Sequence, residues 1–207
     1  MMISEETLKQ LREALSSYMS PPRREHSLSV EKECAVIGKV CRMTEEEISM
    51  LRVSALLHDL TRELPLEKQL ALFEKSNTPL PADGILSTAV LHQFTSPMVI
   101  SSDFPAFDLP EITQPIASHT TGKKEMSLPA KILFLADIIE PKRLHRFCRE
   151  TRKKFYEHLG EENLIDSTLL ACLGDTITHL IVKGDRVSVQ TLEAYNYYSL
   201  RKDKEKN

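Results

Sequence analysis

The sequence predicts an all-α protein folded as a single compact helical bundle, and three observations support this. In most segments apolar residues recur every three or four positions, which is the spacing of a helix with one buried face. No segment alternates apolar and polar residues with the period of two that a half-buried strand requires. No internal repeat divides the 207 residues, a length that suits one domain with a proper core.

The N-terminal segment, residues 1–22, is predicted to be a short helix and linker packed on the domain. Ser4 and the two glutamates that follow it are typical of a helix start, and two consecutive prolines mark the end of the segment. Residues 23–200 form the domain itself. The charged tail, residues 201–207, is expected to fray.

Capping signals and apolar spacing predict the helices of the domain. Thr44 followed three positions later by Glu47 is a capping box, which fixes the start of one helix. Pro65 suits the first turn of another helix. The predicted helices are 24–41, 44–59, 65–73, one that includes 89–92, one that leads to 119, then 129–139, 164–182 and 191–200, with loops at 76–84 and 101–110.

Composition excludes several classes of protein. The chain has 27 Lys and Arg against 30 Asp and Glu, a net charge of −3, which argues against a protein that coats nucleic acid through bulk positive charge. Four scattered cysteines form no CxxC pair, and there is no glycine-rich phosphate loop. We see neither a signal peptide nor an apolar run near the ~20 residues of a membrane helix. We therefore expect a cytoplasmic protein that binds no nucleic-acid polymer and no membrane.

Histidine and aspartate residues recur on successive predicted helices. They are His26, His58 with Asp59 directly after it, His92, His119 and Asp137. A helical bundle can bring residues from different helices together at its centre, which is how bundles build metal sites. Imidazole nitrogens with carboxylate oxygens suit iron, manganese, cobalt or zinc better than calcium.

Asp137 is the most informative single residue. It lies in the stretch 132–139, which is otherwise wholly apolar. Burying a lone carboxylate costs several kcal/mol, so this side chain needs a metal, a cation or several hydrogen-bond donors. The alternative to a metal is a carboxylate that caps a neighbouring helix or pairs with Arg143. The remaining histidines fit no such pattern and are assigned to the surface or the core: His145, His158 and His179.

Several longer stretches are similar to one known family. They are RREH at 23–26, ALLHD at 55–59, LH at 91–92, HTTG at 119–122, KILFLADIIEP at 131–141 and TLEAYN at 191–196. Together they span nearly the whole chain. The chain resembles the HD-domain metal-dependent phosphohydrolases and, within them, the YqeK-type symmetrical bis(5′-nucleosyl)-tetraphosphatases.

The resemblance implies a metal site and a reaction. A divalent metal, iron first with manganese, cobalt or zinc as alternatives, would be held by His26, His58, Asp59 and Asp137. Asp59, His92 and His119 would be catalytic, and the two histidines could instead hold a second ion. The implied reaction is hydrolysis of diadenosine tetraphosphate to two ADP by a metal-activated water. Members of the family tend to dimerise, which implies a homodimer.

Substrate contacts follow from the same resemblance and from the position of the basic residues. The expected substrate is a dinucleoside polyphosphate. Arg62 and Arg143 are the basic residues that we select as phosphate ligands, because they lie close in sequence to the metal ligands. The full set of expected substrate-binding residues is His26, Asp59, Arg62, His92, His119, Thr120, Asp137, Arg143, Thr191, Leu192, Glu193, Ala194, Tyr195 and Asn196.

Two alternatives stay open, and the chain departs from the family in three places. The same site could serve a nucleotidase, a deoxynucleotide triphosphohydrolase or a phosphodiesterase, or the chain could bind a metal or nucleotide without turnover. Arg24 replaces a usual aromatic residue and Arg62 a usual lysine. The segment 144–148 replaces the usual turn after Pro141, which leaves the nucleotide contacts near Arg143 open.

Overall fold

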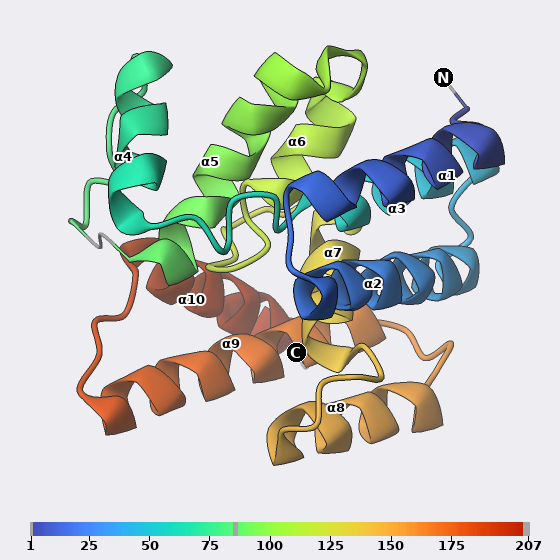
Figure 1. Ribbon diagram of the computed structural model, residues 1–207. Helices are drawn as coiled ribbons and strands as arrows, with labels where there is room; N and C mark the ends of the chain where they lie inside the picture. The colour runs from blue at the N-terminus through green and yellow to red at the C-terminus, as the bar shows by residue number, and fades with distance from the viewer. Residues whose placement is uncertain (1, 85–86, 205–207) are drawn as a thin grey trace.

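The computed structural model describes residues 2–84 and 87–204, and within these ranges it contains helices and no strand (Figure 1). The predicted all-α fold is therefore confirmed. The α-helices are α1 (Glu5–Ala14), α2 (Pro21–Val40), α3 (Glu45–Leu57), α4 (Leu66–Lys75), α5 (Thr88–Asp103), α6 (Pro110–Ile116), α7 (Leu128–Ile139), α8 (Arg146–Glu157), α9 (Leu164–Lys183) and α10 (Val189–Lys204), with short 3-10 turns at Leu15–Ser17 and Pro105–Phe107.

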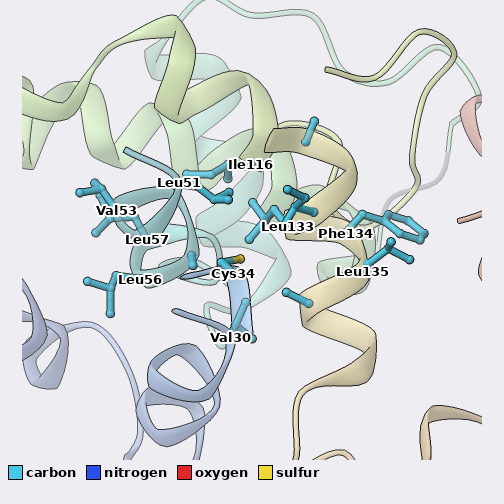
Figure 2. Packing of buried hydrophobic residues seen from close by; sticks show 14 of the residues in the cluster. Val30, Cys34, Leu51, Val53, Leu56, Leu57, Ile116, Leu133, Phe134 and Leu135 are labelled. Atoms are coloured by element: carbon cyan, nitrogen blue, oxygen red, sulfur yellow. The ribbon is translucent and has the colours of Figure 1, made fainter. Parts of the chain in front are cut away.

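The central helix is α7, and its sequence explains why. It is apolar on nearly all sides, which is typical of a helix surrounded by protein. It packs against α2, α3, α6, α8 and α9. Figure 2 shows Leu133 of α7 facing buried Leu51 of α3, while Phe134 points to the opposite side of the helix. An aspartate on this helix therefore lies next to the core.

Helices α2 and α3 form the pair that positions two of the expected ligands. The turn between them is only four residues long, and it makes the helices antiparallel neighbours. The start of α2, with His26, consequently lies beside the end of α3, with His58. Buried Glu31 of α2 ties the pair together, because it accepts hydrogen bonds from Arg12 of α1 (2.9 Å) and Arg52 of α3 (3.0 Å).

Three segments differ from the sequence-based expectation. Helix α8 was not predicted, because its many charges hide the spacing of Phe147, Thr151 and Phe155 along one face. Helix α5 continues through Pro97 to Asp103, into the expected loop at 101–110. Helix α10 runs through Lys204, so it includes residues 201–204 of the expected tail, while 205–207 lie outside the described residues; fraying of the tail stays a prediction.

Helix α9 bears on the expectation that no segment could span a membrane. With a mean hydropathy of 1.3 over its most apolar window, it is long and apolar enough to do so, by length and composition only. Only 17% of that window is buried in the protein. A single helix of this kind is weak evidence for a membrane span, and α9 packs against α7, α8 and α10.

Candidate metal centre

The fold brings the histidines and aspartates of the predicted constellation together. His26 comes from α2, His58 and Asp59 from the end of α3, His92 from α5, His119 from the turn after α6, and Asp137 from α7. They form three overlapping groups, each with ligand atoms within 4.8 Å of one another: His26, His58 and Asp59; His58, His119 and Asp137; Asp59, His92 and His119.

Asp59 joins the two halves of this cluster. Its Oδ1 lies 3.1 Å from Nε2 of His92 and 3.8 Å from Nε2 of His119. Its Oδ2 lies 3.4 Å from Nε2 of His58 and 3.8 Å from Nε2 of His26. The carboxylate is 4% exposed. One buried carboxylate therefore faces all four imidazoles.

Three of the rings are oriented by their own helical turn. Nδ1–H of His58 donates to the carbonyl of Ala55 at 2.7 Å, and Nδ1–H of His119 donates to that of Ile116 at 2.7 Å. His92 does the same with Thr88 at 3.0 Å. Because a carbonyl oxygen only accepts, Nδ1 carries the proton and Nε2 keeps its lone pair. Each Nε2 points into the cluster, as metal-binding histidines do.

The donor set fits a divalent metal. Nε2 of His58 is buried and has no hydrogen-bond partner among the described residues. Nε2 of His92 and Nε2 of His119 lie 2.9 Å apart, and with both protons on Nδ1 their lone pairs face each other. Buried lone pairs that converge beside two carboxylates need a cation between them. Imidazole and carboxylate ligands suit first-row divalent metals.

Asp137 lies in the His/Asp cluster and also pairs with Arg143, the two possibilities that its position in the sequence left open. Its Oδ1 lies 2.9 Å from Nε2 of His26, inside the cluster. The same oxygen accepts a hydrogen bond of 2.6 Å from Arg143, whose Nε also donates to the backbone carbonyl of Asp137. The predicted pairing with Arg143 therefore coexists with a position in the candidate metal centre.

Comparison with known proteins identifies the family. Residues 23–142 match the model of the HD domain, which is more than half of the chain. The chain belongs to the HD-domain family. The matched span contains every residue of the His/Asp cluster.

Curated relatives confirm the narrower resemblance, and all three are named "Bis(5'-nucleosyl)-tetraphosphatase, symmetrical". The relative from Staphylococcus aureus is 26% identical over 179 residues, 86% of this chain and 87% of that protein. The one from Bacillus subtilis is 28% identical over 148 residues, 70% and 74% of the two chains. A third, from Halalkalibacterium halodurans, is 36% identical over 86 residues, 42% and 43% of the two chains. The prediction of an enzyme agrees with these names.

A solved structure supports the HD-domain fold over the whole length. It is described as a predicted HD superfamily hydrolase involved in NAD metabolism from Clostridium acetobutylicum. The TM-score is 0.81 at 27% identity, and the match covers 97% of this chain and all of that one.

Burial and charge act in opposite directions on the carboxylates of this HD domain. Burial would raise the pKa of Asp59, but its interactions with His58, His119 and His92 outweigh burial and hold the pKa well below its usual range. Burial also opposes ionisation of Asp137, and the Arg143 guanidinium and His26 keep its pKa low. Both side chains are therefore ionised and ready to bind a cation.

Only some of the residues expected to contact the nucleotide lie near the His/Asp cluster. A cavity of about 550 Å³ lies beside it, with Thr120 and Thr191 in its wall. Oγ1 of Thr120 is 3.3 Å from Nε2 of His92 and 3.2 Å from Nε2 of His119, so Thr120 connects cavity and cluster. Arg62 is half-buried, and its positive charge acts on His92. The structure shows no ion pair of Arg62 within the described residues.

The rest of the segment 191–196 does not line this cavity. Ala194 is fully buried in the core, and Tyr195 packs against that core. Glu193 lines a second cavity of about 390 Å³, while Leu192 and Asn196 are exposed elsewhere on α10. Substrate contacts from these residues stay predictions.

Sequence reasoning missed residues that support the site. Arg23 donates to Oδ2 of Asp59 at 2.7 Å. Buried Gln93 accepts hydrogen bonds from the backbone N–H groups of Thr120 and Thr121, at 3.2 Å each, and so fixes the turn that carries His119. Arg23 is the first residue of the RREH stretch, three positions before His26, and Gln93 directly follows His92. Their proximity in sequence was a usable signal.

The stability of the metal-free HD domain is expected to depend on pH through two histidines with opposite signs. Burial, opposed by Asp59, lowers the pKa of His92 to about 4. The unfolded chain binds a proton at His92 near pH ~6.5 and the folded chain does not, so the free energy of unfolding decreases as pH falls from 6.5 to 4. Burial opposes protonation of His26, but Asp137 and Glu140 outweigh it and raise its pKa to about 9. The contribution of protonated His26 to the free energy of unfolding is therefore lost as pH rises from 6.5 to 9.

Urea titrations in chelator at several pH values measure this dependence. We expect the unfolding midpoint to be highest near pH ~6.5. In wild type the unfolding midpoint should decrease between pH ~6.5 and ~5, a range above that in which ordinary carboxylates titrate. In His92→Asn this decrease should disappear. If the unfolding midpoint of His92→Asn decreases below pH ~6.5 as much as that of wild type, His92 is not the source of this pH dependence.

Proposed function

We propose that this protein is a metal-dependent hydrolase that cleaves dinucleoside tetraphosphates symmetrically into two nucleoside diphosphates. The observation that carries the proposal is the buried cluster of four Nε2 atoms and two carboxylates, connected through Thr120 to a cavity of about 550 Å³. The substrate class is supported by the names of the three curated relatives. No observation favours a nucleotidase, a phosphodiesterase or a non-catalytic module.

The side chains of the cluster divide into metal ligands and substrate-facing groups. We propose that His26, His58, Asp59 and Asp137 hold the ion, iron first, with manganese, cobalt or zinc as alternatives. A bound divalent ion supplies a water of lowered pKa and neutralises phosphate oxygens. In this arrangement the ionised carboxylate of Asp59 would also accept a hydrogen bond from the attacking water and so orient it.

His92 and His119 face the same centre from the cavity side. With Thr120 they form a polar wall: the Thr120 hydroxyl, and either imidazole once its Nε2 takes up a proton, can donate hydrogen bonds to phosphate oxygens, or, as the alternative, the two Nε2 atoms hold a second ion. Arg62, without an ion pair among the described residues, is suited to neutralise a further phosphate. A homodimer and a cytoplasmic location are part of the same proposal.

Product analysis tests the proposal. The purified protein is incubated with diadenosine tetraphosphate and iron, manganese, cobalt or zinc, or with chelator, and products are separated by anion-exchange chromatography. We expect ADP alone, and none in chelator. ATP with AMP would contradict symmetrical cleavage, and absence of turnover with every metal would contradict this substrate class.

Two arginine variants are expected to separate substrate binding from metal binding. Arg62→Gln should raise the Michaelis constant by about 10-fold and leave metal content unchanged, because its charge reaches His92 but contacts no ligand carboxylate. Arg143→Ala should lower metal content as well as raise the Michaelis constant, because Arg143 holds Asp137. Steady-state kinetics with metal analysis of each variant gives both quantities. Unchanged kinetics in Arg62→Gln would remove Arg62 from the substrate site.

A further inference from the structure

One buried carboxylate beside the centre has no place in the function described so far. Glu140 follows α7 directly and is 1% exposed. Its Oε1 lies 3.2 Å from Nδ1 of His26, on the side of the ring opposite the ligand atom Nε2. We propose that Glu140 is a positioning residue that holds His26 in its metal-binding orientation. The inference rests on the proposed metal centre and on no particular substrate.

His26 needs such a partner because its own helix does not supply one. The other three rings donate Nδ1–H to a carbonyl three or four residues earlier in the chain. His26 contacts instead a residue 114 positions away. The orientation of this ring therefore depends on the packing of α2 against the end of α7.

Glu140 is itself held at several points. Its second oxygen, Oε2, accepts the backbone N–H of Lys142 at 2.7 Å. Arg152 of α8 donates to the carbonyls of Ile139 (3.1 Å) and Glu140 (2.5 Å). Both carboxylate oxygens and the adjacent backbone are thus fixed. A carboxylate held in this way makes the histidine more basic and fixes the ring, which strengthens its bond to a metal.

The contact also gives His26 a chemistry that differs from that of the other rings. A charged carboxylate is a stronger acceptor than a neutral carbonyl. Nε2 of His26 lies 2.9 Å from Oδ1 of Asp137, and Nδ1 of the same ring lies 3.2 Å from Oε1 of Glu140. The ring therefore lies between the two carboxylates. The geometry makes His26 and Glu140 one unit, and loss of the second should weaken ligation by the first.

Zinc affinity provides the test, measured without nucleotide by competition with a chromophoric chelator. We expect Glu140→Ala to bind zinc about 10- to 100-fold more weakly than wild type. Glu140→Gln keeps an acceptor oxygen without the charge and should lose less, between about 3- and 10-fold. The matched control is Glu33→Gln, which removes another buried carboxylate, hydrogen-bonded to Tyr156 at 2.5 Å and in contact with no histidine of the cluster. Its zinc affinity should match that of wild type.

The absorption spectrum of the cobalt-loaded protein separates positioning from a merely structural role. A changed ligand field in the Glu140 variants, with the wild-type spectrum in Glu33→Gln, supports the proposal. A lowered unfolding temperature with wild-type zinc affinity and spectrum in both Glu140 variants would overturn it. If Glu140→Ala does not fold, Glu140→Gln alone decides. Failure to produce ADP with zinc affinity intact would sink the proposed function and leave this inference standing.

Discussion

Asp59→Asn is expected to lower kcat/KM for diadenosine tetraphosphate by about 10³-fold or more and to abolish stoichiometric metal binding. The carboxylate faces all four imidazoles and accepts from Arg23. Asparagine has nearly the same shape but no charge, so it removes the anion that balances a divalent ion, a loss of several kcal/mol of charge stabilisation. Single-turnover kinetics and metal analysis on the same preparation measure both effects.

The control for this prediction is an aspartate of different surroundings. Asp103→Asn changes an exposed residue that accepts a hydrogen bond from Tyr18 at 3.0 Å and is the last residue of α5, at the opposite end of that helix from His92. We expect wild-type kinetics and metal content in that variant. Retention of most of the activity in Asp59→Asn, together with normal folding by circular dichroism, would contradict the proposed centre.

Phe134→Ala is expected to destabilise the protein by about 3–5 kcal/mol. Phe134 is 2% exposed and lies in the middle of α7, among the buried residues of Figure 2. Its ring packs beside Gly122, which has a φ of +66° and so suits glycine. Truncation leaves a cavity at the centre of the bundle and removes support from the turn that carries His119.

Thermal unfolding measures this prediction. For a chain of this size, a loss of about 4 kcal/mol corresponds to a decrease in Tm of roughly 10 °C. Leu144→Ala provides the comparison, since Leu144 is 76% exposed and its truncation should change stability by about 0.5 kcal/mol or less. Equal Tm values for the two variants would show that α7 is not the central element of the core.

Much of the fold and of the cluster could be predicted from the sequence. The capping box at Thr44 is present, with Glu47 Oε2 accepting from the Thr44 N–H at 2.8 Å. An aspartate in an apolar helix cannot be buried without partners, and Asp137 has them in His26 and Arg143. Strong local physical constraints of this kind leave a trace in the sequence.

The remainder depends on contacts between distant segments. The contact between Glu140 and His26 cannot be inferred from residue types, because it is set by how α2 packs against α7. Helix α8 escaped prediction because charged residues outnumber the apolar ones on its surface. Which side chains of 191–196 face the cavity depends on the rotation of α10 about its axis, and a short sequence motif does not report that rotation.

The ligands of the cluster come from segments spread between residues 26 and 137, so ion and fold depend on each other. An ion held by residues of separate helices binds only the folded chain, and it stabilises that chain by about 4 kcal/mol when its free concentration is about 1,000 times Kd. Metal starvation would then remove this stabilisation and increase the fraction of unfolded chains exposed to proteases. We therefore expect the cellular abundance of the protein, and not only its catalytic rate, to follow the supply of its metal.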